Sequence, residues 1–558
     1  MRISKMFFKT YKEDPQDAEI KSHKLMVRAG YIKKQTAGVY MFMPLGLRVL
    51  RKLCDVIREE MDNAGACEMQ MTSLLPIETY SGRLEHFGSD MFRLQDRSGK
   101  EMCLGPSHEE VFTAVVKDAI TSYKQLPQLL YQIQTKFRDE VRPRFGLMRG
   151  KEFLMKDAYS YDVDKAGLDK SYNLMAETYK RIFNRLGLKF VIVNADNGSM
   201  GGSASQEFMV KSSIGEDEII VCDDCGYASN IEKAECVYTP KDVSSITKLE
   251  KKLQYTPNLK TISDLVEPLN KKESDMLKAV VYKVDDKKIV AAFVPGDREI
   301  EEIKLLRCLG GINIEMASPE DIESIGSVAG FVGAIGLKNC TVVADNSVKD
   351  MVNFIIGANK LDYHYENANL EDLHIDIFAD IKKAKAGDIC PNCGKVLQSI
   401  RGIEVGHIFK QNTKYTEAQQ CKYLDVDGKS KYMEMGAYGI GVTRTMSAII
   451  EQNSDDLGII LPDEIAPYKV EIVIANIKNE DQVVLAEKIY NDLLNKKVEV
   501  LLDDRQDAIG AKLKDAELIG VPYIVVVGKN TAEGKVELIN RHNMARDIID
   551  AKEIINKF

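Results

Sequence analysis

Two short cysteine motifs, far apart in the chain, restrict how this sequence can fold. Cys222 and Cys225 are separated by two residues and followed by glycine, and Cys390 and Cys393 repeat this pattern. Glycine directly after such a pair lets backbone N–H groups turn towards both sulfur atoms, as in zinc knuckles. One pair could be a redox motif or chance, but two pairs favour a single tetrahedral four-cysteine zinc site.

The segment between the two cysteine pairs is far too long to be a loop and predicts an inserted domain. Its residues 237–385 have an α+β pattern, with a helix over 261–269 and a hairpin of strands over 277–284 and 289–294. One shared zinc ion would hold the entry and the exit of this insert together. Four thiolate ligands leave no coordination position for water, so the metal would be structural.

The composition is that of a soluble protein with several domains. At 558 residues, with 44% hydrophobic and 29% charged residues, the chain should form about two to four globular domains. No apolar run approaches the ~20 residues that span a bilayer, and the first residues lack the pattern of a signal peptide. Eleven cysteines, an odd number, suit a reducing compartment. We therefore predict a cytoplasmic protein with no membrane partner.

The segment 131–156 is basic, although the chain as a whole has a net charge of −9. It contains seven lysine or arginine residues and three acidic residues. Strand alternation would place Lys136, Arg138 and Glu140 on one side, and a turn over 142–146 would precede a returning strand. Such a basic hairpin suits phosphate, but an ordinary solvated hairpin explains the charge equally well.

The segments before this hairpin should be mainly helical. An amphipathic helix is expected over 45–64, followed by a strand over 66–75, and a further helix should run over 105–125. Ser107 and Glu110 have the spacing of a capping box, which leaves the two residues between them without a structural role.

Two glycine-rich segments differ in what they indicate. In 436–444 the alternating glycines, including Gly439 and Gly441, let a strand lie flat beneath a planar group, and Arg444 then projects from the start of a helix. The segment 198–208 lacks the Lys-Ser/Thr pair of a phosphate-binding loop. We predict only a tight turn there, whether or not a small ligand lies beside it.

From residue 466 the pattern changes to alternating strands and helices. This change predicts a separate C-terminal α/β domain over 466–558 with a largely parallel or mixed sheet. Strands are expected at 470–475, 498–502 and 523–527, and helices at 481–495, 508–519 and 549–557.

Several strings resemble the motifs of class II aminoacyl-tRNA synthetases. KFRDEVRPR at 136–144 resembles motif 2, GIGVTR at 439–444 resembles motif 3, and the helix and strand over 45–72 resemble motif 1. Together with GPSHEE, EFLMKDAYS, GGSAS, RGIEVGHIF and LLDDR, they resemble the bacterial type of prolyl-tRNA synthetase over essentially the whole chain. That family carries an editing domain between motifs 2 and 3.

The resemblance implies an α+β protein built on the antiparallel-sheet catalytic domain of class II synthetases. Residues 1–236 and 386–465 would form this domain, with the editing domain at 237–385 inserted and an α/β anticodon-binding domain at 466–558 following. It also implies a homodimer that uses tRNA(Pro), proline and ATP with Mg²⁺. Proline would first be joined to AMP and then transferred to the 3′ end of the tRNA.

The resemblance also implies roles for individual residues in activation. Arg138 would contact the α-phosphate and the carboxylate of proline, where a planar bidentate donor serves better than lysine. Glu140 would hold the adenine amino group and Phe153 would stack on the ring. The implied ATP-binding set is Arg138, Glu140, Arg149, Phe153, Gly439, Gly441 and Arg444, of which Arg138, Glu140 and Arg444 would be catalytic.

Three further sets follow from the same resemblance. Proline would bind to Ser107, Glu109 and Arg138, with Glu109 facing the secondary ammonium. Mischarged alanyl-tRNA would be hydrolysed in a pocket that excludes proline by size, at Lys278, Asp345 and His364. The anticodon would be read by Asp504, Arg505 and Lys512.

Some positions depart from the family pattern. Thr72 stands where motif 1 usually ends in proline, and Lys151 replaces an arginine. Ala437 and Gln206 stand where many relatives have cysteine and histidine. Because many relatives also lack the paired cysteines, the zinc prediction rests on cysteine spacing alone.

Two other functions are compatible with these observations. One is a synthetase-like protein that only binds tRNA, and the other is a class II synthetase for another amino acid, such as alanine or threonine. Retention of Arg138, Glu140 and Arg444 argues against the first. Adenylate formation compared across amino acids would decide the second.

Overall fold

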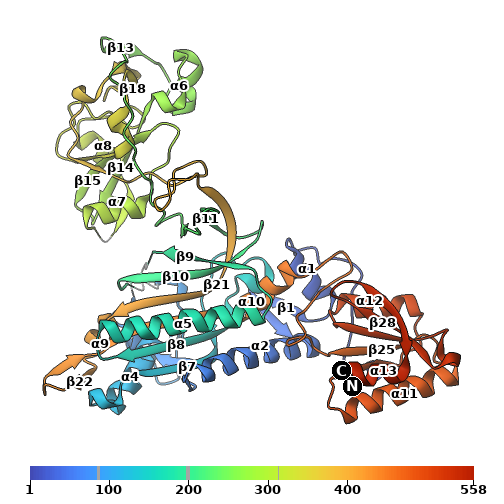
Figure 1. Cartoon of the computed structure of the whole chain (residues 1–558). Coiled ribbons are helices and arrows are strands. Elements are labelled where there is room, and N and C mark those ends of the chain that lie inside the picture. Colours follow the sequence, from blue (N-terminus) through green and yellow to red (C-terminus); the bar gives the residue numbers. More distant parts are fainter. Residues whose placement is uncertain (85–87, 197–200, 312) are drawn as a thin grey trace. The chain divides into compact units, whose positions relative to one another are not determined.

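The computed structural model describes residues 1–84, 88–196, 201–311 and 313–558, which form two compact units. The first unit comprises Met1–Ile192, Asn197–Glu216 and Gly402–Phe558. The second comprises Val193–Asp196 and Asp217–Arg401. Figure 1 shows the elements of each unit along the chain. The second unit exceeds the expected insert at 237–385, because it includes both turns that carry the paired cysteines.

A mainly antiparallel sheet forms the centre of the first unit. Its strands pair in the order β10 (Ala204–Lys211), β21 (Gln398–Asn412), β24 (Glu434–Gly441), β8 (Glu152–Asp162), β7 (Gln128–Phe137) and β3 (Cys67–Glu68). Among these six strands, only β3 runs parallel to its neighbour. The extended antiparallel sheet is the architecture that the resemblance implied.

Three helices cover one face of this sheet, namely α2 (Pro44–Asn63), α5 (Lys165–Arg185) and α10 (Val442–Gln452). On that face Ile182 and Phe183 of α5 share a buried core with Ala158 of β8 and Ile440 of β24. Because side chains alternate along a strand, the intervening residues of β8 project from the opposite face. On that face Tyr159 and Tyr161 pack against Phe112 of α4 (Glu109–Ala119), so only the rest of the face remains for a ligand.

Three local expectations need correction. The segment 66–75 is not one strand, since β3 joins the central sheet and β4 (Leu74–Pro76) joins a three-stranded sheet. The helix α4 spans only Glu109–Ala119 and is followed by a short 3-10 turn at Tyr123–Gln125. Strand β7 ends at Phe137, so the alternation does not extend to residue 140. The expected turn at 198–208 lies partly outside the described residues.

Shorter elements complete the part of the first unit that contains this sheet. They are α1 (Lys21–Arg28), β1 (Ile32–Thr36), β2 (Val39–Phe42), β5 (Arg93–Gln95), β6 (Glu101–Leu104), α9 (Lys414–Ala418), β22 (Lys422–Leu424) and β23 (Ser430–Tyr432). In the described parts of the chain, no helix is both long and apolar enough to cross a membrane.

The second unit has two small sheets and short helices. Its main sheet pairs in the order β16 (Ile314–Met316), β14 (Leu277–Val284), β15 (Lys288–Pro295), β17 (Thr341–Asp345) and β20 (Ile377–Ala379). A second sheet contains β13 (Lys252–Tyr255), β19 (Tyr363–Ala368) and β18 (Phe354–Gly357). The expected hairpin β14–β15 and the helix α6 (Ile262–Leu269) are confirmed.

The C-terminal part of the first unit contains a five-stranded mixed sheet. Three parallel strands, β26 (Val500–Asp503), β25 (Val470–Ile474) and β27 (Tyr523–Val527), are extended by the antiparallel strands β28 (Lys535–Asn540) and β29 (Ala545–Asp550). The helices are α11 (Glu480–Asn495), α12 (Ile509–Leu518) and α13 (Ala551–Lys557). The mixed sheet was expected, whereas the last two strands were missed.

Candidate active site

The face of the central sheet opposite α2, α5 and α10 contains a cavity of about 420 Å³. It is bounded by β8, β21 and β24, by the start of α10 and by the loop before α4. All nine residues expected to bind ATP or proline line it: Ser107, Glu109, Arg138, Glu140, Arg149, Phe153, Gly439, Gly441 and Arg444. The fold thus brings three distant segments of the sequence to one site.

Arg138 lies directly after β7 at the wall of this cavity. Its guanidinium carbon is 5.3 Å from the ring centroid of Phe153, and Nη2 donates to the carbonyl of Pro106 at 3.4 Å. Burial lowers the pKa of Arg138, and the charge of nearby Arg444 lowers it further. An arginine remains protonated even so. Two cations held close together make the cavity suited to an anionic ligand.

Arg444 is fixed by the chain around it. Its Nε donates to the carbonyl of Met148 at 2.9 Å, and Nη1 donates to the carbonyl of Glu404 at 3.1 Å. The neighbouring strand is flat at Gly439, where an added Cβ would meet only Met155 Sδ at 4.0 Å. Packing alone therefore does not require this glycine, and its lack of a side chain leaves space for a ligand.

Glu140 and Arg149 face each other across the turn between β7 and β8. Arg149 Nε donates to Glu140 Oε2 at 2.9 Å, and this hydrogen bond raises the pKa of Arg149. A second acidic group, Glu216, lies 3.6 Å from Arg149 Nη1. The turn is therefore held by ion pairs at the mouth of the cavity.

The loop before α4 is not held by a capping box. His108 is the N-cap residue of α4, and no side chain caps the helix. Ser107 Oγ instead accepts from Arg83 Nη2 at 3.0 Å, and Glu110 accepts two bonds from Arg83 at 2.6 Å. The expected pairing of Ser107 with Glu110 fails because a buried arginine engages both side chains.

Lys136 does not face the cavity, contrary to the alternation expected from the sequence. It is fully buried, and its Nζ lies 2.8 Å from Asp157 Oδ1 and 2.9 Å from His108 Nδ1. His108 Nε2 is in turn 3.0 Å from the carbonyl of Thr72. Lys136 therefore has a structural role, because its contacts with His108 and Asp157 connect the loop before α4 to the sheet.

Sequence reasoning missed a cluster on β10 and β21. Glu404 and His407 line the cavity, and His407 Nδ1 lies 3.1 Å from Glu404 Oε1 and 3.6 Å from Glu207 Oε1. Burial would raise the pKa of Glu404, but the hydrogen bond from His407 and the nearby positive charges hold it at about 2. The string RGIEVGHIF carried the signal, as charged residues within a half-apolar strand.

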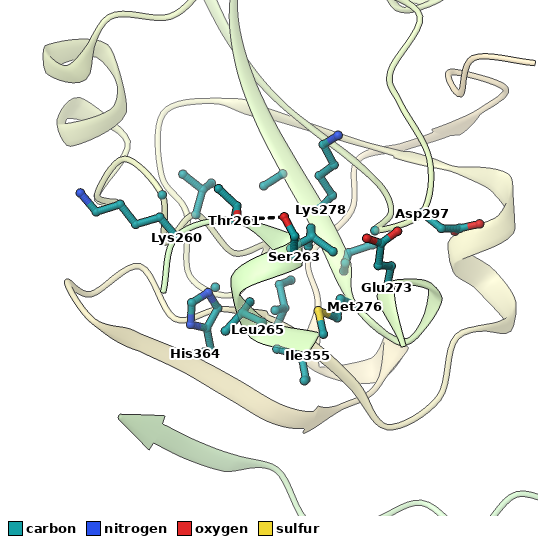
Figure 2. A pocket seen from close by; sticks show the side chains of 18 of the residues that line it. Lys260, Thr261, Ser263, Leu265, Glu273, Met276, Lys278, Asp297, Ile355 and His364 are labelled. Atoms are coloured by element: carbon teal, nitrogen blue, oxygen red, sulfur yellow. Dashed lines mark hydrogen bonds between the residues drawn. The ribbon is translucent and has the colours of Figure 1, made fainter. Parts of the chain in front are cut away.

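A second cavity, of about 520 Å³, lies within the second unit (Figure 2). Lys278 and His364 both line it, and Figure 2 shows them on different sides of the cavity. Lys278 Nζ is 2.7 Å from Glu299 Oε1, and His364 Nδ1 is 2.7 Å from Thr256 Oγ1. Burial lowers the pKa of His364 to about 4, which makes it neutral at pH 7.

Asp345 does not line this second cavity. It is fully buried at the end of β17, where its carboxylate accepts from the backbone N–H groups of Ser347, Ile381 and Lys382 at 2.9, 3.1 and 3.2 Å. These bonds join the end of β17 to the segment at 381–382 and explain the aspartate structurally. The structure therefore brings together two of the three residues expected for editing.

The four paired cysteines meet in the second unit. Cys222 Sγ is 3.5 Å from Cys393 Sγ, and Cys225 Sγ is 3.6 Å from Cys390 Sγ. All four sulfur atoms lie within 4.8 Å of one another, close to the separation of about 3.8 Å that a tetrahedral zinc–thiolate site requires. Gly226 and Gly394, which follow the two pairs, have φ values of 74° and 73°, in agreement with the turns predicted there. These residues fit a zinc ion.

The three residues expected to read the anticodon differ in accessibility. Asp504 accepts from Ser4 N and Oγ at 3.0 and 2.7 Å. Arg505 is bound by Asp503 at 2.7 Å. Lys512 is fully buried and donates to the carbonyl of Ile474 at 2.8 Å. Lys512 therefore has a structural role here and does not offer its charge to a nucleic acid.

Two family models match the chain. A family model described as the tRNA synthetase class II core domain (G, H, P, S and T) matches residues 92–453, and one described as an anticodon binding domain matches residues 469–558. The chain is therefore a class II aminoacyl-tRNA synthetase with an anticodon-binding domain.

The relatives narrow this class to one amino acid. Proline--tRNA ligases from Caldicellulosiruptor bescii and Sulfurihydrogenibium sp. are 52% and 46% identical to the chain, covering 97% and 100% of it and 95% and 99% of their own lengths. The chain belongs to the proline--tRNA ligase family and joins proline to tRNA.

Solved structures support the fold. Two crystal structures of prolyl-tRNA synthetase from Cryptosporidium parvum, one with halofuginone and AMPPNP and one with L-proline and AMP, have TM-scores of 0.59 and 0.58. Each covers 96% of this chain, and the chain covers 75% and 73% of theirs, at 12% identity. At this identity the likeness concerns the fold alone.

Proposed function

We propose that the 420 Å³ cavity is where proline is activated by ATP. The observation that carries this proposal is the convergence of Arg138, Arg444 and Glu109 on one cavity from three separate segments. Activation requires an oxygen of the proline carboxylate to attack the α-phosphorus of ATP while pyrophosphate leaves. Both reactants are anionic, so positioned cations lower the barrier without a covalent nucleophile.

We assign a residue of the cavity to each contact with the nucleotide. Arg138 bridges the α-phosphate and the proline carboxylate, Phe153 stacks on adenine, and Arg444 binds the terminal phosphates. Glu140 and Arg149 hold the adenine end, and Gly439 and Gly441 keep the sheet flat beneath the nucleotide. ATP arrives as its Mg²⁺ complex, and Glu404 and Glu207 offer the carboxylate oxygens that Mg²⁺ prefers.

Glu109 and Ser107 hold the amino-acid end of the substrate. The Glu109 carboxylate pairs with the secondary ammonium of proline, and Arg138 holds its carboxylate. A ribose hydroxyl at the 3′ end of tRNA(Pro) then attacks the carbonyl carbon of the adenylate, and AMP leaves. Both steps, adenylate formation and transfer to tRNA, depend on how the substrates are positioned and do not need a reactive side chain.

Proline-dependent exchange of pyrophosphate into ATP tests the assignment. Exchange should appear with proline and Mg²⁺ and should be much weaker with alanine or threonine. Variants Arg138→Ala and Arg444→Ala should abolish it while the protein stays folded. Unchanged exchange in both variants would overturn the placement of the site.

We place hydrolytic editing of mischarged alanyl-tRNA in the 520 Å³ cavity of the second unit. Support comes from the shared lining by Lys278 and His364 and from the apolar residues beside them, which suit a small side chain. A size filter of this kind corrects errors that one binding site cannot prevent. Asp345 acts indirectly, because its backbone contacts hold β17 in place.

We place a structural zinc ion at the four cysteines. It would be held by four thiolates, and its chemistry would be to cross-link the two turns rather than to activate water. The four-cysteine cluster supports this assignment through its sulfur separations.

The remaining parts of the proposal concern assembly. The C-terminal domain at 466–558 would read the anticodon with Asp504 and Arg505, with Lys512 supporting that region from within. We also propose a cytoplasmic homodimer, with catalytic parts at 1–236 and 386–465 and an editing insert at 237–385.

A further inference from the structure

A buried arginine lies behind the proposed proline-binding loop. Arg83 is 4% exposed and is not among the described residues that line the cavity. Its Nη2 donates to Ser107 Oγ at 3.0 Å and to Glu109 Oε2 at 2.9 Å. Arg83 therefore touches both residues of the loop that we assign to proline.

Arg83 is also bound by a second glutamate. Its Nε and Nη2 donate to the two oxygens of Glu110 at 2.6 Å each, which is the bidentate arrangement of a strong arginine–carboxylate pair. Glu109 Oε2 accepts a longer bond, of 2.9 Å, from Nη2 of the same guanidinium. The stronger partner of Arg83 is therefore Glu110, which does not line the cavity among the described residues.

The charges in this group do not balance. When both glutamates are ionised, Arg83, Glu109 and Glu110 together carry one net negative charge, and all three side chains are at most 10% exposed. Burial lowers the pKa of Arg138 and of Lys414, and the charge of Glu109 opposes that shift in both, so these two cations offset part of the negative charge. A buried group of this kind is costly unless a further cation completes it. The ammonium of an amino-acid substrate is such a cation, and Glu109 is the member that reaches the cavity wall.

We propose that Glu110 and Arg83 set the charge of the proline pocket: Glu110 occupies Arg83, so that Glu109 keeps its negative charge for the substrate ammonium. Both are positioning residues, since neither touches the cavity. The inference rests on the proposed role of Glu109 as the ammonium partner. Arg83 aims the Glu109 carboxylate, and Glu110 prevents Arg83 from neutralising it.

The variant Glu110→Gln tests this directly, because glutamine keeps the shape of glutamate and removes its charge. Arg83 and Glu109 would then neutralise each other. We expect the KM for proline in pyrophosphate exchange to rise about tenfold, the effect of weakening one charge-assisted interaction. The KM for ATP should not change. An unchanged KM for proline would overturn the inference.

An analogue without the amine separates charge from structure. Cyclopentanecarboxylate has the ring and carboxylate of proline but no ammonium, so its inhibition constant should be unchanged in Glu110→Gln. If that constant rises as much as the KM for proline, the loop has merely loosened and the inference is wrong. Glu60→Gln is a matched control, since Glu60 is 7% exposed, accepts from Arg181 and Arg185, and lies outside the cavity lining.

Glu109→Gln distinguishes this inference from the proposed function beneath it. That variant should weaken the binding of proline and leave the binding of cyclopentanecarboxylate unchanged. If it fails to do so, Glu109 is not the ammonium partner and both proposals fall. If it does so while Glu110→Gln behaves as wild type, only the inference falls.

Discussion

Lys136 and Arg138 are two residues apart in one basic segment, and the structure predicts opposite consequences for their removal. Lys136 is fully buried with its Nζ 2.8 Å from Asp157, whereas Arg138 lines the cavity that we propose as the active site. Lys136→Met would leave Asp157 buried without its cation, which costs about 3–5 kcal/mol. Arg138→Met removes a cation from a site where burial already disfavours it, so stability should be unchanged or slightly higher.

The order of the two substitutions is reversed for catalysis, where Arg138→Met should have the larger effect. Loss of one positioned donor for developing charge costs about 2.7–4 kcal/mol, or about 10²–10³ in rate. Arg138→Met should therefore lower kcat/KM for pyrophosphate exchange by at least that factor. Lys136→Met should lose activity only in proportion to the unfolded fraction.

Urea unfolding and exchange kinetics on both variants check this pair of predictions. The unfolding midpoint should fall clearly for Lys136→Met and stay near wild type for Arg138→Met. The reasoning is refuted if Lys136→Met retains its midpoint but loses exchange activity, because Lys136 would then act on the ligand. It is equally refuted if Arg138→Met unfolds as easily as Lys136→Met.

Three further predictions concern the second unit. Zinc should be found at about one ion per chain and should be lost in Cys390→Ser. Cys236 is a buried cysteine outside the cluster, so Cys236→Ser is the control that should retain zinc. Absence of metal from both variants would contradict the assignment. Lys278→Ala should slow hydrolysis of alanyl-tRNA without changing proline activation, and equal hydrolysis would move the editing site elsewhere. Burial lowers the pKa of His364 from 6.5 to about 4. As the pH falls, His364 therefore takes up its proton in the unfolded chain before it does so in the folded chain. The contribution of neutral His364 to folding stability is complete above about pH 6.5 and is lost between about pH 6.5 and 4. Unfolding midpoints of the wild type and of His364→Asn should converge over that range, and parallel curves would contradict the shift.

Motif residues were predictable from the sequence because their chemistry depends on residue type and order. Arg138, Phe153 and Arg444 were assigned from three separate strings, and the fold places all three around one cavity. The paired cysteines were likewise predictable, since spacing and the following glycine determine the turn that presents both sulfur atoms.

Buried charges could not be recognised in the same way. Lys136 and Lys512 look like accessible cations in the sequence, yet both are fully buried with partners from other elements. Asp345 follows a strand as an active-site acid would, but it caps backbone N–H groups. Arg83 stands in a segment without any recognisable pattern. Tertiary pairing decides these roles, and a single sequence does not contain it in readable form.

The position of the four cysteines affects how the catalytic sheet can assemble. Strands β8 and β24 pair side by side although the whole insert separates them in sequence. The entropy lost on closing a loop grows with its length, so an unfolded insert would slow that pairing. An insert that folds first, with Cys222 and Cys393 joined through one metal, brings its two ends together. With zinc bound as we propose, the sheet would then close across a short bridge, and zinc supply would affect the folding rate of a site that contains no zinc ligand.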